Sequence, residues 1–282
     1  MQLGKFQLTT VSGGRFKSDG GTIFGVVPKA LWSRVIPVDE NNMIPQATNC
    51  VLVDTGSKKI LIDTGYGSKL PEKQRKIISA EEGNPLLESL SEQGLGPRDI
   101  DIVVLSHLHF DHAGGATGLT ETGDLIPTFP RAESYAQRRE WVTATADFPE
   151  LAGAYPGENL WPLDNSGQLR LVDGTWEIEP GVRMEVSGGH TEGHSVIVLE
   201  SEGQTAVYLG DLCPSTRHFN SRWCMAYDVD LLETRRRKPE WLGRIADGNW
   251  LALFDHDPDF AAAYLERDDR KEFRVREAFE VL

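Results

Sequence analysis

Four apolar runs of the sequence each lead to a residue of a type that binds metal ions in proteins. The runs VVLSH, MEVSGGH, AVYLGD and LALFDH end at His107, His190, Asp211 and His256. Because the composition of these runs is typical of β-strands, we expect the four residues to lie just beyond strand ends. Loops that follow strand ends collect side chains from distant parts of a chain. The fold must therefore bring four strand ends to one edge.

The first of these runs continues into the sequence SHLHFDHAGG, residues 106–115. The chain has seven histidines, and three of them lie here within six positions, together with Asp111. Residues two apart in an extended segment point the same way, so His107 and His109 can reach one ion. Asp111 and His112 follow where the chain turns, and they can point elsewhere. One tetrahedral ion cannot take four ligands from so short a segment, so the spacing predicts two ions side by side.

The other strand ends can complete the binding of these two ions. Imidazole nitrogens suit zinc and similar divalent ions, and a carboxylate adds a hard oxygen donor. We expect the first ion to be bound by His107, His109 and His190. The second ion would be bound by Asp111, His112 and His256, and Asp211 would bridge the two ions. We expect two divalent metal ions here, zinc first, with manganese, cobalt and iron as alternatives.

Composition and charge exclude several other classes of protein. The net charge of −14 repels nucleic acids and anionic membranes, so we expect neither as a partner. No apolar run approaches the ~18 residues of a membrane span, and the N-terminal residues lack the apolar core of a signal peptide. The three cysteines, Cys50, Cys213 and Cys224, include no C-x-x-C pair, which favours a reducing compartment. We therefore predict a cytoplasmic protein.

Local patterns predict most secondary-structure elements. We expect hairpins over 50–65 and 194–211, strands over 101–106 and 249–256, and two or three short strands within 169–190. Helices are expected over 84–97, 133–147 and 231–246. The first forty residues read as irregular, and 272–282 carry no assignment. The basic run 235–238 is interpreted as a solvated helix face.

Several motifs of the chain resemble those of the metallo-β-lactamase superfamily. They are LIDTG (61–65), SHLHFDH (106–112), GGHTEGHS (188–195), GD (210–211) and FDHD (254–257). The resemblance extends over about residues 50–260 and implies an α/β protein, an αββα four-layer sandwich with a dinuclear metal site at one edge. It implies the same seven ligands, and it gives Asp63 the place of an aspartate that orients the metal-site loop. We expect residues 1–282 to form a single domain.

Within this superfamily, the chain resembles quorum-quenching N-acyl-homoserine lactonases and lactonase-like relatives. The resemblance lies in residues 20–42, in GDLCPSTRH (210–218) and in WCMAYD (223–228). It implies a hydrolase that opens a lactone or ester through attack by a metal-bridging hydroxide, with Asp111 and Asp211 as catalytic residues. Residues 1–45 would form an N-terminal extension on the substrate side. Similar lactonases commonly form dimers, which makes a homodimer an expectation here as well.

The chain departs from these lactonases at one position. Some lactonases carry a tyrosine three residues after the bridging aspartate, whereas this chain has Pro214 there. His218 or Tyr227 could replace that hydroxyl. The remaining histidine, His194, is interpreted as a hydrogen-bonded residue behind the ligands, and Cys213 as a buried thiol. An apolar pocket for the substrate is predicted from Phe24, Val26, Trp32, Met43, His218, Trp223, Met225 and Tyr227.

Other activities remain compatible with the same ligand set. The first alternative is a hydrolase of the same fold that acts on phosphotriesters, thioesters or β-lactams. The second is a di-iron oxidoreductase, although no flavin-binding segment accompanies the motifs. The third is a metal-binding protein without catalytic activity. Neither the acyl chain length nor the physiological substrate follows from the motifs.

Overall fold

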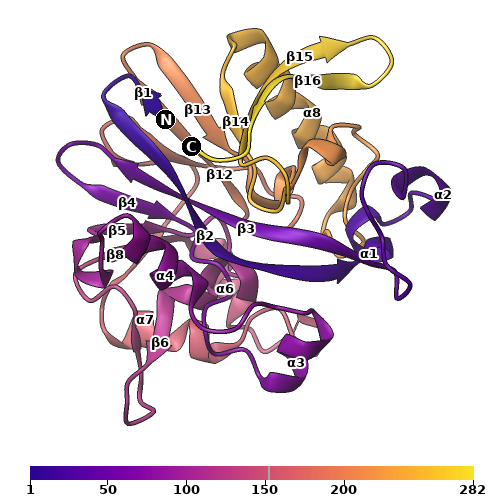
Figure 1. Cartoon of the computed structure of the whole chain (residues 1–282). Coiled ribbons are helices and arrows are strands. Elements are labelled where there is room, and N and C mark those ends of the chain that lie inside the picture. The colour runs from indigo at the N-terminus through magenta and orange to yellow at the C-terminus, as the bar shows by residue number, and fades with distance from the viewer. Residues whose placement is uncertain (152) are drawn as a thin grey trace.

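Two seven-stranded β-sheets pack face to face in the computed structural model, which describes residues 1–151 and 153–282 (Figure 1). Helices α4 (Pro85–Glu92) and α6 (Arg138–Ala144) pack on the outer face of the first sheet. Helix α8 (Leu231–Gly248) packs on the outer face of the second sheet. These four layers confirm the predicted αββα sandwich.

The strands follow each other in nearly chain order across the two sheets. In spatial order the first sheet contains β1 (Gln2–Leu3), β2 (Phe6–Asp19), β3 (Met43–Asp54), β4 (Lys59–Ile62), β5 (Ile102–Val104), β8 (Glu133–Gln137) and β9 (Leu169–Val172). The second sheet contains β10 (Trp176–Glu179), β11 (Val182–Val186), β12 (Ser195–Ser201), β13 (Gln204–Tyr208), β14 (Leu251–Leu253), β15 (Ala262–Asp268) and β16 (Glu272–Phe279). A small hairpin pairs β6 (Thr117–Leu119) with β7 (Leu125–Pro127). The remaining helices are α1 (Gly20–Phe24), α2 (Lys29–Trp32), α3 (Glu72–Ile77), α5 (Phe110–Ala113) and α7 (Trp161–Asn165).

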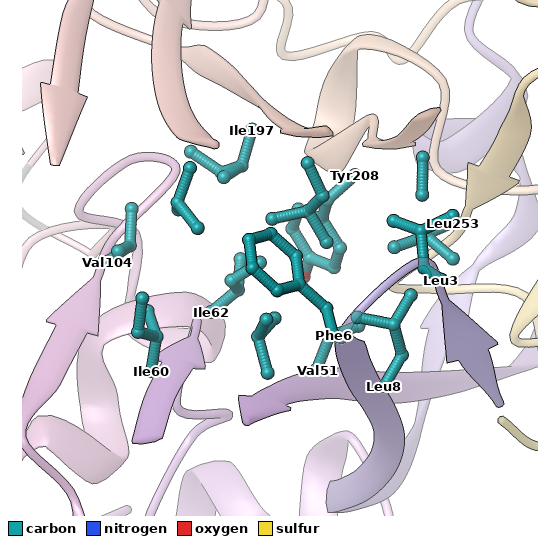
Figure 2. Packing of buried hydrophobic residues seen from close by; sticks show 14 of the residues in the cluster. Leu3, Phe6, Leu8, Val51, Ile60, Ile62, Val104, Ile197, Tyr208 and Leu253 are labelled. Carbon is teal, nitrogen blue, oxygen red and sulfur yellow. The ribbon is translucent and has the colours of Figure 1, made fainter. Parts of the chain in front are cut away.

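A continuous apolar core fills the space between the two sheets (Figure 2). Phe6, Val51 and Ile62 approach from the first sheet, and Ile197 and Tyr208 approach from the second. Apolar side chains alternate with outward-facing residues along these strands, because successive residues of a strand point to opposite faces. Burial of this surface holds the sheets in fixed register and so fixes where the strand ends lie.

Strand directions place the predicted ligand loops at one edge of the sandwich. In the first sheet, β4 and β5 are parallel. In the second sheet, β13 and β14 are parallel, and β11 runs the same way because β12 is antiparallel to both β11 and β13. The loops after these five strands therefore emerge at common edges of the two stacked sheets. This arrangement is the one that the four polar strand ends require.

The hairpin predicted over 50–65 is confirmed, and hydrogen bonds at its turn explain where the chain reverses. The chain turns between β3 and β4, where the Thr55 amide donates to the Lys58 carbonyl at 3.0 Å. Gly56 has φ of 87°, a left-handed conformation that side chains other than glycine rarely adopt. The Asp54 carboxylate accepts from the Gly56 amide at 2.8 Å, as aspartates before turns commonly do.

The irregular structure predicted for the first forty residues was wrong over residues 2–19. Strand β2 pairs with β3 over most of its length, and the register shifts between Ser12 and Arg15. Gly13 and Gly14 lie at this bulge, and a side chain at Gly14 would collide with the Tyr66 hydroxyl oxygen at 2.1 Å. The glycine pair thus marks a β-bulge, where a strand bends without ending. Within the predicted N-terminal extension, residues 20–42 are the long segment that lies outside the strands.

Two other expectations, over residues 133–147 and 235–238, need correction. The helix predicted over 133–147 begins with a strand, because residues 133–137 form β8 and only residues 138–144 form α6. The unassigned tail contains β16, which pairs with β15.

In α8, Arg236 and Arg237 are solvent-exposed partners of Glu233, as a solvated face requires, but Lys238 is buried. Position 238 follows Thr234 by one helical turn and shares its buried face. None of the described helices combines the length and the apolar character that a membrane-spanning helix needs.

Candidate metal centre

All seven predicted ligands converge where the loops of the two sheets meet. His107 and His109 follow β5, and α5 begins immediately afterwards and carries Asp111 and His112. The three others lie in the loops after β11, β13 and β14, as the sequence predicts. The seven side chains form two groups that share one carboxylate.

The first group contains three imidazoles and one carboxylate. His109 Nδ1 lies 3.0 Å from His107 Nε2 and 3.0 Å from His190 Nε2. Asp211 Oδ2 lies 3.0 Å from His190 Nε2. All four residues are buried, and one donor atom of each lies within 4.8 Å of the others. His109 thus presents Nδ1 to the group, whereas the two other histidines present Nε2.

The second group contains one residue that the motifs did not predict. His112, His256 and Asp211 are joined there by Asp255, again with donor atoms within 4.8 Å of one another. Asp211 Oδ1 lies 3.2 Å from His256 Nε2, so the carboxylate of Asp211 faces both groups. Asp111 lies beside the second group, with Oδ2 at 3.6 Å from His256 Nε2. The side chain of Asp111 is 14% exposed, which places it on the open side.

The chemistry of this donor set fits a pair of divalent cations. Asp211 Oδ1 and Asp255 Oδ2 are buried oxygens without a hydrogen-bond partner, although buried polar atoms are normally paired. Burial and then the neighbouring imidazoles lower the pKa of His107 and of His109 well below the usual value. Both rings are therefore neutral at pH 7, as metal ligands must be. Buried carboxylate oxygens without a hydrogen-bond partner, beside a cluster of imidazole nitrogens, leave positions that cations would satisfy.

Hydrogen bonds behind the ligands fix the orientation of the imidazoles. Asp63 accepts from His112 Nδ1 at 2.8 Å and from the Ser106 amide at 2.7 Å. Ser106 Oγ in turn contacts His107 Nδ1 at 3.1 Å. Asp63 has φ of 56°, so the turn after β4 holds it in a left-handed conformation. Its predicted place behind the ligand loop agrees with these contacts, which are of the kind that tunes metal affinity in proteins.

The two ligands from the second sheet have comparable partners. His190 Nδ1 lies 2.9 Å from Asp228 Oδ1, and His256 Nδ1 lies 2.7 Å from the Ala47 carbonyl oxygen. Asp228 was not among the predicted residues. Its segment is tied to the ligand loop, since the Val229 amide donates to the His190 carbonyl at 3.0 Å. With each Nδ1 engaged, both Nε2 atoms remain directed into the ligand groups.

His194 has no free nitrogen for a metal ion. Its Nδ1 lies 2.6 Å from Ser187 Oγ, and its Nε2 accepts from the Asp211 amide at 3.0 Å. A side chain at Gly210 would approach His194 Nε2 to 2.6 Å, so the close contact requires glycine there. His194 therefore supports the backbone of Asp211, which agrees with its interpretation from the sequence. Cys213 is buried, and all three cysteines are free.

The sequence of the chain matches a known family over most of its length. The profile of the Metallo-beta-lactamase superfamily matches residues 43–243. This chain belongs to the metallo-β-lactamase superfamily.

Relatives in the metallo-β-lactamase superfamily include enzymes with named activities. An N-acyl homoserine lactonase of Bacillus cereus is 27% identical over 178 residues, a match that covers 60% of this chain and 64% of the relative. The chain thus spans less than two thirds of that relative's length. A lactamase-like protein, nscB, from Aspergillus fumigatus is 31% identical over 64% of this chain and 43% of its own.

Solved structures of the metallo-β-lactamase fold superimpose on nearly the whole chain. A probable metal-dependent hydrolase from Staphylococcus aureus is 34% identical, with a TM-score of 0.87 over 99% of this chain and 100% of that chain. The dizinc quorum-quenching lactonase AidC, in complex with its product N-hexanoyl-L-homoserine, is 22% identical, with a TM-score of 0.81 over 98% and 96% of the two chains. The second likeness concerns the fold alone.

A buried carboxylate that sequence reasoning missed joins two ligand loops of this metallo-β-lactamase fold. Glu140 in α6 accepts from the Leu108 amide at 3.1 Å and the Gly193 amide at 3.2 Å. It also accepts from Thr191 Oγ1 at 2.6 Å and Tyr155 Oη at 3.1 Å. Leu108 lies between two predicted ligands, and Thr191 follows a third. Burial raises the pKa of Glu140 above its usual value, although these hydrogen bonds favour the carboxylate.

Most of the predicted pocket residues instead form a packed cap beside the metal centre. Phe24, Trp32 and Met225 are at most 2% exposed, so they offer a substrate no free surface. Phe24 stacks between Trp32 and His218, with ring centroids 5.4 and 4.8 Å away. The cap also contains the partly buried Trp223. The expected apolar pocket wall is therefore corrected to an apolar cluster that supports residues 20–42.

The other predicted pocket residues divide between the cap and the open side. Both nitrogens of His218 are engaged, with Ser215 Oγ at 2.8 Å and the Ile23 carbonyl oxygen at 3.2 Å. Burial lowers the pKa of His218 to about 3, so it is a neutral structural residue and no substrate donor. Val26 is 73% exposed, and Met43 is partly buried. Only Tyr227 is both exposed and next to the ligands, with its ring 5.7 Å from that of His190.

Phe24→Ala is expected to destabilise the protein by about 3–5 kcal/mol, because it leaves a cavity among three aromatic rings. Urea denaturation of the metal-free protein measures this change. The matched control is Phe148→Ala, since Phe148 is 51% exposed and its loss should cost about 0.5 kcal/mol or less. Equal effects of the two substitutions would show that the cap contributes no more stability than a surface residue.

Proposed function

We propose that this protein is a metal-dependent hydrolase that opens a lactone or a related ester, with an N-acyl-homoserine lactone as the favoured substrate. The observation that carries the proposal is the pair of ligand groups that share Asp211. The activity named for the Bacillus cereus relative supports the choice of substrate. Such an activity would make the protein a quorum-quenching enzyme.

We propose that zinc occupies both sites, with the ligand partition expected from the sequence. Two bound divalent ions would polarise a carbonyl oxygen and lower the pKa of bound water toward about 7, which supplies a nucleophile at neutral pH. Burial alone would raise the pKa of Asp211, but His190 and His256 outweigh it and lower this pKa well below its usual value. Asp211 therefore keeps its negative charge, which a bridging ligand needs.

The chain's own residues supply the proton transfers and the orientation of the substrate. Asp111 lies at the open side of the second group, where its carboxylate can accept a proton and pass it to the departing alkoxide. Tyr227 lies across from it, beside His190. Tyr227 is 44% exposed as a whole, but desolvation of its hydroxyl and then the carboxylates of Asp211 and Asp111 raise the pKa of that hydroxyl well above its usual value. Tyr227 thus stays protonated and can donate to a lactone carbonyl in place of the tyrosine absent at Pro214.

Tyr227→Phe is expected to lower kcat/KM for lactones by about 10²-fold, because one donor to the developing oxyanion is lost. Metal content should stay that of the wild type. Tyr264→Phe is the matched control, since Tyr264 packs against Phe279 in the second sheet, away from the ligands. Unchanged lactone kinetics in Tyr227→Phe would assign the missing hydroxyl to another group.

A substrate panel tests the proposed activity directly. The purified protein, loaded with zinc or manganese, is given acyl-homoserine lactones of several chain lengths, aryl esters, thioesters, a β-lactam and a phosphotriester. We expect the highest kcat/KM with a lactone. A higher kcat/KM with a phosphotriester would show that the protein is a phosphotriester hydrolase instead. Visible absorption from bound iron would favour the di-iron oxidoreductase.

A further inference from the structure

Asp255 has an unusual environment for an aspartate outside the predicted ligand set. It directly precedes His256, and its side chain is only 2% exposed. Its Oδ1 accepts from the His256 amide at 2.9 Å. Its Oδ2 is buried and has no hydrogen-bond partner. The Asn49 amide donates to the Asp255 carbonyl at 2.7 Å and so holds this loop against β3.

The unpaired oxygen faces two imidazole nitrogens and forms a hydrogen bond with neither. Asp255 Oδ2 lies 3.6 Å from His112 Nε2 and 3.4 Å from His256 Nε2, beyond ordinary hydrogen-bond lengths. The Nδ1 atoms of the two rings already contact Asp63 and the Ala47 carbonyl, so each Nε2 is directed inward. A buried carboxylate oxygen without a hydrogen bond is costly, and a cation placed between this oxygen and the two nitrogens would satisfy it.

These separations agree with those of ligands that share one ion. Two donors bound at about 2.0–2.2 Å in tetrahedral geometry lie about 3.4 Å apart. The distances from Asp255 Oδ2 to the two nitrogens match this value. Those from Asp111 to His256 Nε2 and His112 Nε2, 3.6 and 3.9 Å, match it less well. Asp255 therefore occupies a ligand position at least as well as the predicted Asp111 does.

We propose that Asp255 is an eighth metal-ligating residue, which binds the second ion together with His112, His256 and Asp211. The inference rests on the metal centre of the proposed function and extends its ligand set. It makes the second site richer in carboxylate oxygen than the first, which contains three imidazoles. Carboxylate oxygens suit harder ions such as Mn²⁺, whereas imidazoles suit zinc. The second site should therefore discriminate less strongly against Mn²⁺.

Metal titration of three proteins tests this assignment. The metal-free wild type, Asp255→Asn and Asp255→Ala are titrated with Zn²⁺ and, separately, with Mn²⁺ in a calorimeter, and metal content is measured after dialysis. The matched control is Asp257→Asn, because Asp257 is equally buried but its oxygens accept from Thr216 and Arg217. We expect two ions in the wild type and the control. Both Asp255 variants should keep the first ion and bind the second at least about tenfold more weakly.

Thermal melting of the metal-free proteins separates a ligand from a structural residue. Asparagine keeps an oxygen for the His256 amide and removes the charge of the unpaired oxygen, so the Tm of metal-free Asp255→Asn should equal that of the wild type or exceed it. A lower Tm, or a second ion bound with wild-type affinity in both variants, would overturn the assignment. If the wild type itself bound fewer than two ions, the metal centre of the proposed function would fail together with this inference.

Discussion

Asp211→Asn is expected to weaken the binding of both ions at once and to lower kcat/KM by about 10³-fold or more. The reason is that Asp211 belongs to both ligand groups, with Oδ2 near His190 and Oδ1 near His256. An amide offers one neutral oxygen where the carboxylate offers two charged ones. The lost charge stabilisation corresponds to several kcal/mol, at about 1.4 kcal/mol for each factor of ten.

The measurement is metal content after dialysis against buffered zinc, together with lactone hydrolysis. Asp228→Asn is the matched control, since Asp228 supports only His190 and so only the first group. Asp228→Asn should weaken the binding of the first ion by about 10–100-fold and leave the binding of the second ion unchanged. If Asp211→Asn lost one ion and kept the other at wild-type affinity, Asp211 would not bridge the sites.

Glu140→Ala is expected to destabilise the metal-free protein by about 3 kcal/mol or more. Glu140 accepts four hydrogen bonds, two of them from the backbone amides of Leu108 and Gly193. Alanine leaves these buried donors unpaired, at about 1–3 kcal/mol for each donor that water cannot reach. Both ligand loops would lose their shared anchor, so metal affinity should fall as well.

Urea denaturation and zinc titration of the same samples check this prediction. Glu133→Ala is the matched control, because Glu133 pairs with Arg170 at the surface and its loss should cost about 1 kcal/mol or less. Glu140→Gln should recover part of the stability, since one of its amide atoms still accepts. Wild-type stability and zinc affinity in Glu140→Ala would show that α6 does not hold the ligand loops.

Local sequence predicted which residues converge at the candidate site, because their spacing and their position after strands are local features. His107, His109 and His112 follow β5 directly, and the other ligands also come within a few residues of a strand. The four-layer fold followed from the family motifs. Element boundaries were predicted wrongly where one local pattern fits two structures. The glycine pair in β2, for example, is compatible with irregular structure and with the β-bulge that the strand contains.

The supporting residues could not be predicted from local patterns, because their partners are distant in sequence. Asp228 lies 38 residues from His190, and Glu140 lies 32 residues from Leu108 and 53 from Gly193. Only the packing of α6 and of the segment before α8 brings them to the ligands. Asp255 carried a signal, since it adjoins His256 in FDHD, but the seven-ligand pattern left no role for it. The homodimer and the cytoplasmic location stay predictions.

Anomalous diffraction from crystals grown with zinc tests the central claim most directly. The account predicts two peaks about 3.5–4 Å apart, one among His107, His109 and His190, and one between His112 and His256. Asp211 should contact both peaks. A single peak, or zinc bound only outside these two groups, would contradict the account.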